Sequence, residues 1–157
     1  MFKCKVFIAN YNRKKEYELT EFDFLGYTFK GVFIKYRNGG IGVNFIASAS
    51  KDSNKALRDK IKSLEIHKKT GCSIDMITEV VNPIIRGWIN YFCKYNPHAT
   101  KYSLDCADRR LVKWAMSKFK RFRGYRKRAE KWLSEVKKRE PNLFAHWQYR
   151  NRSVVMS

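Results

Sequence analysis

The chain has 157 residues and a mass of 18.7 kDa, which is enough for one domain with a buried core. Apolar residues make up 44% and aromatic residues 15%, which argues against intrinsic disorder. Thirty-four Lys and Arg against fourteen Asp and Glu leave a formal net charge of +20. No run of about 18 apolar residues occurs, which excludes an integral membrane protein. A secretory signal is absent as well, so we expect a cytoplasmic protein.

A net charge of +20 predicts an anionic partner. Nucleic acid is favoured, because Lys and Arg side chains that neutralise phosphates release the counterions bound there. An anionic membrane surface is the competing interpretation. The simplest interpretation is a basic surface that only keeps the protein in solution.

The cysteines and histidines are dispersed and predict neither a metal site nor a cofactor. No Cys-x-x-Cys or Cys-x-x-His occurs, so a structural zinc site has no support. We expect reduced and mostly buried thiols at all four cysteine positions, which are Cys4, Cys72, Cys93 and Cys106.

The first 47 residues are predicted to form antiparallel β structure with four strands. Residues 3–9 alternate Lys with apolar residues, which is the period of a strand. Residues 22–29 are strongly aromatic and are assigned to a second strand. Asn38-Gly39 separates two β-rich runs, at 31–36 and 41–46, and is typical of a hairpin turn.

From residue 48 the apolar period becomes helical, so the predicted fold class is α+β, a short N-terminal antiparallel segment followed by a mainly helical bundle. Ser48 or Ser50 is expected to cap the first helix and Ser73 the second. The second helix is expected to point Ile74, Ile77, Val80 and Val81 inward. At Asn82-Pro83 we predict a break, with Asn82 capping a new helix, Pro83 at its first position and Pro97 at its end.

Two further helices and a tail complete the expected bundle. One helix is predicted from about Thr100 to Phe122 and another from Tyr125 to Arg139, separated by Gly124. Residues 143–149 are aromatic and are expected to pack on the bundle. The predicted divisions are 1–47 (β), 48–124 (helical) and 125–157 (a basic helix and aromatic tail).

The densest positive charge lies between residues 109 and 131, with eleven Lys or Arg and one acid. Solvated helix faces usually mix both signs, whereas this run does not, and like charges at close spacing repel unless anions lie across them. We therefore predict contacts with RNA or DNA backbone here. The predicted contact residues in this run are Arg109, Arg110, Lys113, Lys118, Lys120, Arg121, Arg123, Arg126, Lys127 and Arg128.

Two other segments add candidate contacts. Arg86 and Asn90 share one helix face beside Gly87, and a structural hydrogen bond is as plausible for them as a ligand contact. Lysines favour phosphate contacts over base reading. The basic helix that begins at Lys51 and its exit contribute Lys55, Arg58, Lys62, Lys68 and Lys69.

Features of an enzyme are absent from the sequence. Asp105 and Asp108 are the closest pair of aspartates, and Arg109 and Arg110 follow them directly. We expect them to form helix ion pairs rather than to bind Mg²⁺. No phosphate-binding glycine loop, zinc-protease motif or nucleophile elbow occurs, so we predict that the chain is not an enzyme by itself.

Four segments, in this order and spacing, closely resemble the C-terminal part of bacterial group II intron reverse transcriptase/maturases. They are FDFLGYTF (22–29), NPIIRGWINYF (82–92), RRLVKWAMSKFKRFRG (109–124) and LFAHW (143–147). The resemblance runs from about Lys3 to Tyr149. The Asn-Pro-x-x-Arg-Gly-Trp-x-Asn-Tyr run is its most specific part.

The resemblance implies that residues 1–47 are the end of a polymerase palm and that 48–124 form the maturase-specific region called domain X, which takes the place of the thumb. Such proteins bind their own intron RNA, help it fold for splicing and copy it, while the ribozyme supplies the splicing chemistry. The family's Tyr-x-Asp-Asp motif, which holds the catalytic Mg²⁺, does not occur in these 157 residues. RNA binding is therefore carried over and reverse transcription is not.

Several alternatives stay open at this point. The chain is a working RNA-binding maturase fragment, a decayed remnant with only non-specific affinity, or part of a split reverse transcriptase that needs a complementing chain. A helix-turn-helix regulator of DNA is disfavoured because residues 101–110 offer few base-reading side chains. Without the rest of a palm, residues 3–46 are expected to be loosely folded, paired with another chain or prone to aggregation.

Overall fold

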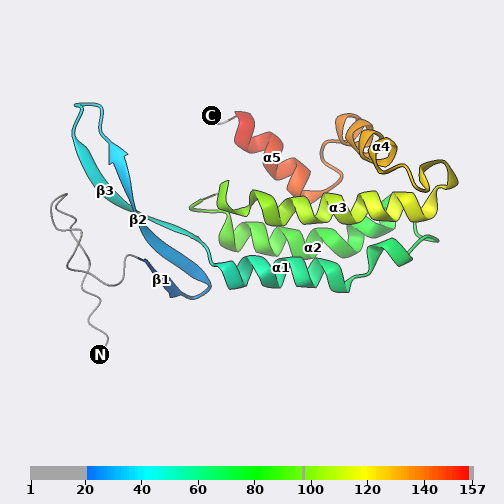
Figure 1. Ribbon diagram of the computed structural model, residues 1–157, viewed down its shortest axis with the longest axis horizontal. Coiled ribbons are helices and arrows are strands. Elements are labelled where there is room, and N and C mark those ends of the chain that lie inside the picture. The colour runs from blue at the N-terminus through cyan, green and yellow to red at the C-terminus, as the bar shows by residue number, and fades with distance from the viewer. Residues whose placement is uncertain (1–20, 97, 156–157) are drawn as a thin grey trace.

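The computed structural model describes residues 21–96 and 98–155. Over these residues it contains a three-stranded antiparallel sheet followed by a helical bundle, so the predicted α+β class is confirmed (Figure 1). The sheet projects from one end of the bundle as a long twisted ribbon. The strand predicted at residues 3–9 lies outside the described residues.

The sheet has the order β1-β2-β3, with β1 at Glu21–Phe24, β2 at Tyr27–Lys35 and β3 at Ile41–Ala49. The expectation of one strand over residues 22–29 is wrong. The chain turns at Leu25 and Gly26, both with positive φ (49° and 79°), and Phe24 pairs with Tyr27. A two-residue turn with positive φ at both positions matches the twist of a hairpin. The predicted Asn38-Gly39 turn is confirmed, with Gly39 at φ 83°.

The β1–β2 turn anchors the sheet on the bundle. Backbone oxygen of Gly26 accepts hydrogen bonds from the Ser50 N–H (2.8 Å) and the Ser53 hydroxyl (2.9 Å). A Cβ at Gly26 would lie 2.7 Å from the Ser53 Oγ, so glycine is required here by both contact and φ. The Tyr27 hydroxyl also donates to the Tyr91 carbonyl oxygen.

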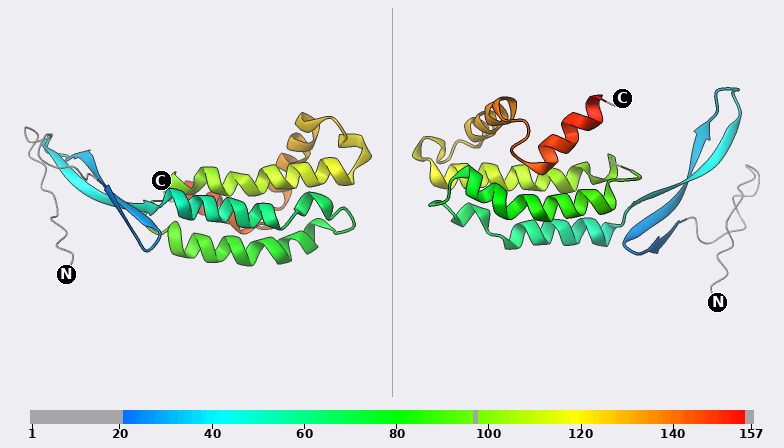
Figure 2. Two further views of the ribbon diagram at one scale, coloured as in Figure 1. Left: turned by 60° about the horizontal axis from the view of Figure 1, so that its bottom comes forward. Right: turned by 180° about the vertical axis from the view of Figure 1, so that it is seen from behind.

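Three long helices form the body of the bundle, α1 at Lys51–Ser63, α2 at Ile74–Phe92 and α3 at Lys101–Lys118, with consecutive helices antiparallel (Figure 2). Ser50 caps α1 by accepting from the Ser53 N–H, and Ser73 caps α2 by accepting from the Met76 N–H. Both caps lie at predicted positions, and of the two candidates at the first helix Ser50 is the cap. A short 3-10 turn, η1 at Ile66–Lys68, follows α1.

The break predicted at Asn82-Pro83 is wrong. Pro83 lies inside the continuous helix α2, on its exposed side, and α2 ends at Phe92, before Pro97. Asn82 makes a longer-range bridge instead of a cap for α2. Its side chain donates to the Leu143 carbonyl oxygen (3.0 Å) and accepts from the Ala145 N–H (2.9 Å), which fixes the start of the last helix.

The predicted helix from Thr100 to Phe122 ends early. Helix α3 stops at Lys118, and a 3-10 turn, η3 at Lys120–Phe122, leads to Gly124 at φ 79°. Helix α4 (Arg126–Arg139) then packs on α3, and α5 (Ala145–Val155) packs on α2 and also contacts α3. The expectation for the aromatic tail is confirmed, since Phe144 and Trp147 are fully buried.

The core lies between α1, α2 and α3 and extends under α4 and α5. Its fully buried side chains include Ile61, Ile85, Leu111 and Trp114. The inward position expected for Val80 is wrong, because 41% of this side chain is exposed. Val80 lies on the opposite side of α2 from Ile85, which faces the core.

A polar cluster fastens α5 to α3. The Asp108 Oδ1 accepts from the Trp147 Nε1 (2.7 Å) and lies 2.7 Å from the His146 Nε2, while Arg150 contacts both Asp105 and Asp108. The two aspartates do form ion pairs, as expected, but their partner is on α5 rather than within α3. Sequence spacing along one helix could not reveal a partner more than forty residues away.

Burial and hydrogen bonds act against each other on the ionisation of this cluster. Burial alone would raise the pKa of Asp108, but His146, Trp147 and Arg150 together lower that pKa below its ordinary value. Burial also lowers the pKa of His146, despite the nearby carboxylate. We therefore assign a neutral His146 whose Nε2–H donates to an ionised Asp108. The Nδ1 of His146 is buried without a hydrogen-bond partner among the described residues.

Candidate nucleic-acid interface

The largest group of predicted contact residues lies at one end of the bundle, on η3 and the first turn of α4. All six are exposed, and we call them the basic end: Lys120, Arg121, Arg123, Arg126, Lys127 and Arg128. Glu130 is the one acid on this segment and pairs with Arg126 at 2.7 Å. The group forms because the chain leaves α3 at Lys118 and turns twice before α4 begins.

Aromatic rings hold two cations of the basic end. The Arg121 guanidinium lies over the Phe122 ring at 4.6 Å from its centroid, and the Arg128 guanidinium lies over Tyr125 at 4.5 Å. Phe122 is itself buried, so its ring is a fixed support. Stacking leaves the planar edge of a guanidinium available to phosphate oxygens.

Lys68, Lys69 and Lys118 lie at the same end of the bundle, where the loop after α1 meets the end of α3 (Figure 1). Lys68 is exposed and pairs with Glu65 at 2.6 Å, while the Lys69 carbonyl oxygen accepts from the Trp114 Nε1. The Lys118 ammonium donates to the carbonyl oxygens of Thr70 (3.0 Å) and Cys72 (2.8 Å). Lys118 thus ties α3 to this loop.

Two predicted arginines lie away from the basic end, and one of them, Arg58, links α1 to α3. The Arg58 Nη1 donates to the Ser103 Oγ (3.2 Å), and its guanidinium lies 5.7 Å from the Tyr102 ring centroid. Arg109 lies over the same ring at 4.8 Å. Tyr102 is 65% exposed, so the two cations and the ring form one polar surface across α1 and α3.

The remaining predicted residues are spread over three helices. Lys55 and Lys62 are exposed on α1, Lys113 is exposed on α3 and Arg110 is partly exposed there. Arg86 and Asn90 are both exposed on α2. The structure therefore brings together the residues of the basic end with Lys68, Lys69 and Lys118, and leaves the others on separate faces.

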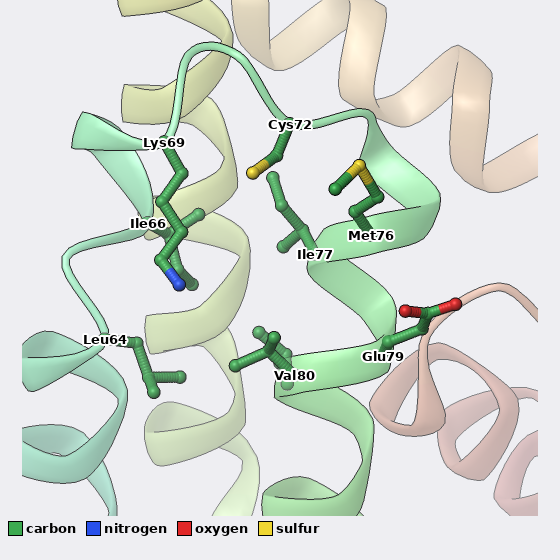
Figure 3. Close-up of a pocket in the computed structure, with 9 residues that line it drawn as sticks. Leu64, Ile66, Lys69, Cys72, Met76, Ile77, Glu79 and Val80 are labelled. Carbon is green, nitrogen blue, oxygen red and sulfur yellow. The ribbon is translucent and has the colours of Figure 1, made fainter.

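Two hollows lie along the groove between α1 and α2, and neither was found by the sequence reasoning. The smaller, of about 180 Å³, lies between the loop after α1 and the start of α2. Figure 3 shows Leu64 and Val80 on its opposite sides, with Lys69 on the loop beside it. The larger, of about 530 Å³, lies nearer the sheet and is lined by Ala56, Lys60, Gly87, Trp88 and others. The sequence signal that could have revealed them is a second apolar stripe on α2, apart from the stripe that faces the core.

The described residues offer no candidate metal centre. No group of three or more His, Cys, Asp and Glu side chains suited to a metal ion occurs within 21–96 and 98–155. Over that range Cys72, Cys93 and Cys106 are free thiols, and burial raises the pKa of Cys93. None of the helices described here has the length and apolar character needed to span a bilayer.

Comparison with known proteins gives one match. The family model of the group II intron maturase-specific domain matches residues 54–132, from the first turn of α1 to the middle of α4. No curated protein matches the chain. No solved structure matches it either. The matched region is half of the chain and contains nearly all of α1, the whole of α2 and α3, and the basic end, so this chain belongs to the family of proteins that carry the group II intron maturase-specific domain.

Proposed function

We propose that this chain binds group II intron RNA through its basic end and helps that RNA reach its splicing-active fold, and that these 157 residues carry no polymerase active site of their own. The observation that carries the proposal is the basic end itself. Six exposed cations with a single neighbouring acid lie inside the region that matches the maturase-specific domain. A group II intron maturase role in splicing is what this domain indicates.

The charge arrangement supports contacts with phosphates. Arg121, Arg123, Arg126, Lys127 and Arg128 follow one another within eight residues, so their mutual repulsion destabilises the free protein. RNA phosphates laid across them would remove that repulsion and release counterions. Because phosphate contacts position a protein without reading sequence, the basic end supplies affinity and orientation rather than base specificity.

A salt series on RNA binding tests the role of the basic end. We expect the double variant Arg123→Gln/Lys127→Gln to bind structured RNA more weakly, with the slope of log K against log salt reduced by about 1.4 to 1.8. The matched control is Lys35→Gln/Arg37→Gln, which removes the same charge from exposed positions on the sheet hairpin. Equal slopes for the two double variants would contradict the proposal.

Specificity for intron RNA separates a working maturase from a decayed remnant. We expect the neighbouring intron RNA to bind about 100-fold more tightly than an unrelated structured RNA, which corresponds to about 2.7 kcal/mol. Equal affinities that fall together with salt would favour the remnant, in which only the charge is kept. A splicing assay with the intron RNA then measures whether binding assists folding.

An exposed face of the sheet favours a second candidate, a part of a split reverse transcriptase that joins a complementing chain. Phe24 (61%), Phe33 (55%) and Ile41 (67%) are largely exposed on one face of the sheet. Such apolar area on a strand surface is typical of an interface. Co-purification with a separately encoded reverse-transcriptase chain that is lost in the variant Phe33→Ser/Phe45→Ser would support this candidate. If no such chain co-purifies, the first candidate, RNA binding by this chain alone, is favoured.

A further inference from the structure

Helix α2 carries an apolar stripe that faces away from the core. Met76, Val80, Pro83, Gly87 and Tyr91 recur at helical spacing, and all five are exposed. None of them is charged, although the chain carries 34 Lys and Arg. A surface helix normally places polar residues on its solvent side, so this stripe indicates a contact that the described fold does not supply.

The larger hollow lies beside this stripe, between α1 and α2. Its α1 side consists of Ser53, Ala56 and Lys60 with the edge of Leu57, and its α2 side includes Trp88 and Phe92. The aromatic rings form a connected wall. The centroids of Trp88 and Phe92 are 5.1 Å apart and those of Tyr91 and Phe92 4.7 Å apart. The hollow, of about 530 Å³, is widely open to solvent, so an occupant would lie against its wall rather than be enclosed.

Gly87 is not explained by packing inside the protein. A Cβ at this position would meet nothing within 4 Å, so no neighbouring helix needs the space. Glycine is also the poorest helix former apart from proline, and the backbone here is helical. A glycine that weakens a helix at an open, groove-lining position allows a ligand to approach the backbone closely.

The charge of the groove lining favours an anionic occupant. Lys60 lines the groove on the α1 side. Arg86 and Asn90 are exposed beyond the stripe, on the other side of Gly87. Aromatic rings beside a lysine suit a nucleotide, because its base is aromatic and its phosphate is charged. A second copy of this chain would bring another charge of +20 to the same place.

We propose that the α1–α2 groove holds one unpaired nucleotide of the bound RNA, with its base against the wall of Trp88, Tyr91 and Phe92 and its phosphate at Lys60. This inference rests on the proposed RNA-binding function and adds to it a site that distinguishes unpaired from paired RNA. The basic end lies at the other end of α2, so the two sites can be altered independently.

The test uses the full chain and two short RNA hairpins that differ in one bulged nucleotide, a fluorescent purine analogue. The wild type should bind the bulged hairpin more tightly and quench its fluorescence. Gly87→Leu and Ala56→Leu fill the groove from its two sides at exposed positions. They should weaken binding of the bulged hairpin by about 5- to 150-fold, the equilibrium factor for one stacked base, and leave the fully paired hairpin unaffected.

Ser134→Leu is the matched control, because it adds the same side chain at an exposed position on α4 away from the groove. Circular dichroism checks that each variant keeps its helices. Unchanged affinity of both groove variants for the bulged hairpin would overturn the inference while the proposed function stands. Failure of the wild type to bind either hairpin would overturn both. A change of oligomeric state with unchanged RNA affinity would assign the groove to a second copy and overturn the inference.

Discussion

Replacing Asp108 by alanine is expected to release α5 from the bundle. This carboxylate accepts from the Trp147 Nε1 and the His146 Nε2, each at 2.7 Å, and both side chains are 0% exposed. A buried donor left without an acceptor costs about 1–3 kcal/mol, so two of them cost about 2–6 kcal/mol. Domains of this size are stable by about 5–15 kcal/mol, so the loss is a large share of the total.

Two variants calibrate this prediction. Asp108→Asn keeps an oxygen acceptor and removes the charge, so we expect a smaller loss than for alanine, about 1–2 kcal/mol. Asp105→Ala removes the other carboxylate that Arg150 contacts; because these groups are partly exposed, about 1 kcal/mol or less is expected. Urea unfolding followed by tryptophan fluorescence and by circular dichroism measures the three variants. An Asp108→Ala protein within about 0.5 kcal/mol of the wild type would refute the reasoning.

Three further predictions concern pH, a bridging lysine and two glycines. Burial holds the pKa of His146 in the folded state below its ordinary value, and the charged groups around it are Asp108, Arg150 and Lys137. As the pH falls, this imidazole is therefore protonated in the unfolded chain at a higher pH than in the folded protein. Stability should therefore fall as pH drops below about 6.5, by at most about 1.4 kcal/mol per pH unit, and His146→Gln should remove that part of the pH dependence in calorimetric scans. Lys118→Met should lower stability to urea by about 1–2 kcal/mol, since the Thr70 and Cys72 carbonyls lose their donor, whereas Lys113→Met, exposed on the same helix, should leave it nearly unchanged. Gly87→Ala should raise the melting temperature through a gain of up to about 1 kcal/mol. Gly26→Ala should lower it, because its Cβ would meet the Ser53 Oγ at 2.7 Å.

Local sequence patterns predicted most elements of the described fold but misjudged several boundaries, and two of these errors have a clear physical cause. The run over residues 22–29 is aromatic throughout, so its turn at Leu25-Gly26 is hidden by strand-like composition. Gly26 is the signal that was available, and the contact with Ser53 shows why glycine is needed there. At Pro83 the error was the reverse, because a break was predicted where the helix is continuous. A proline on the exposed side of a helix costs one hydrogen bond without a steric clash in the core, and packing of Ile77, Val81 and Ile85 keeps α2 continuous.

The sequence predicted the chemistry of the candidate site, a cluster of cations, but not which of these cations lie together in space. The charge run from residue 109 indicated phosphate contacts, and the basic end comes from that run. The same run includes Lys118 and Arg109, which contact the loop after α1 and the Tyr102 ring. These partners are seven to 48 residues away in the sequence. Helical periodicity tells which face a cation occupies, but not whether a distant backbone carbonyl or ring lies there.

The spacing between the two proposed contact regions has a consequence for what this domain can recognise. Helix α2 begins at Ile74, at the same end of the bundle as the basic end. Gly87 lies thirteen residues further along α2, which is about 20 Å. The basic end reads phosphates and the groove accepts any base that stacks, so neither reads sequence alone. An RNA that engages both must present a backbone segment and an unpaired nucleotide at this separation on a rigid scaffold. Selectivity for a folded intron over other RNA then arises from the shape of the RNA, which is the property a folding assistant has to distinguish.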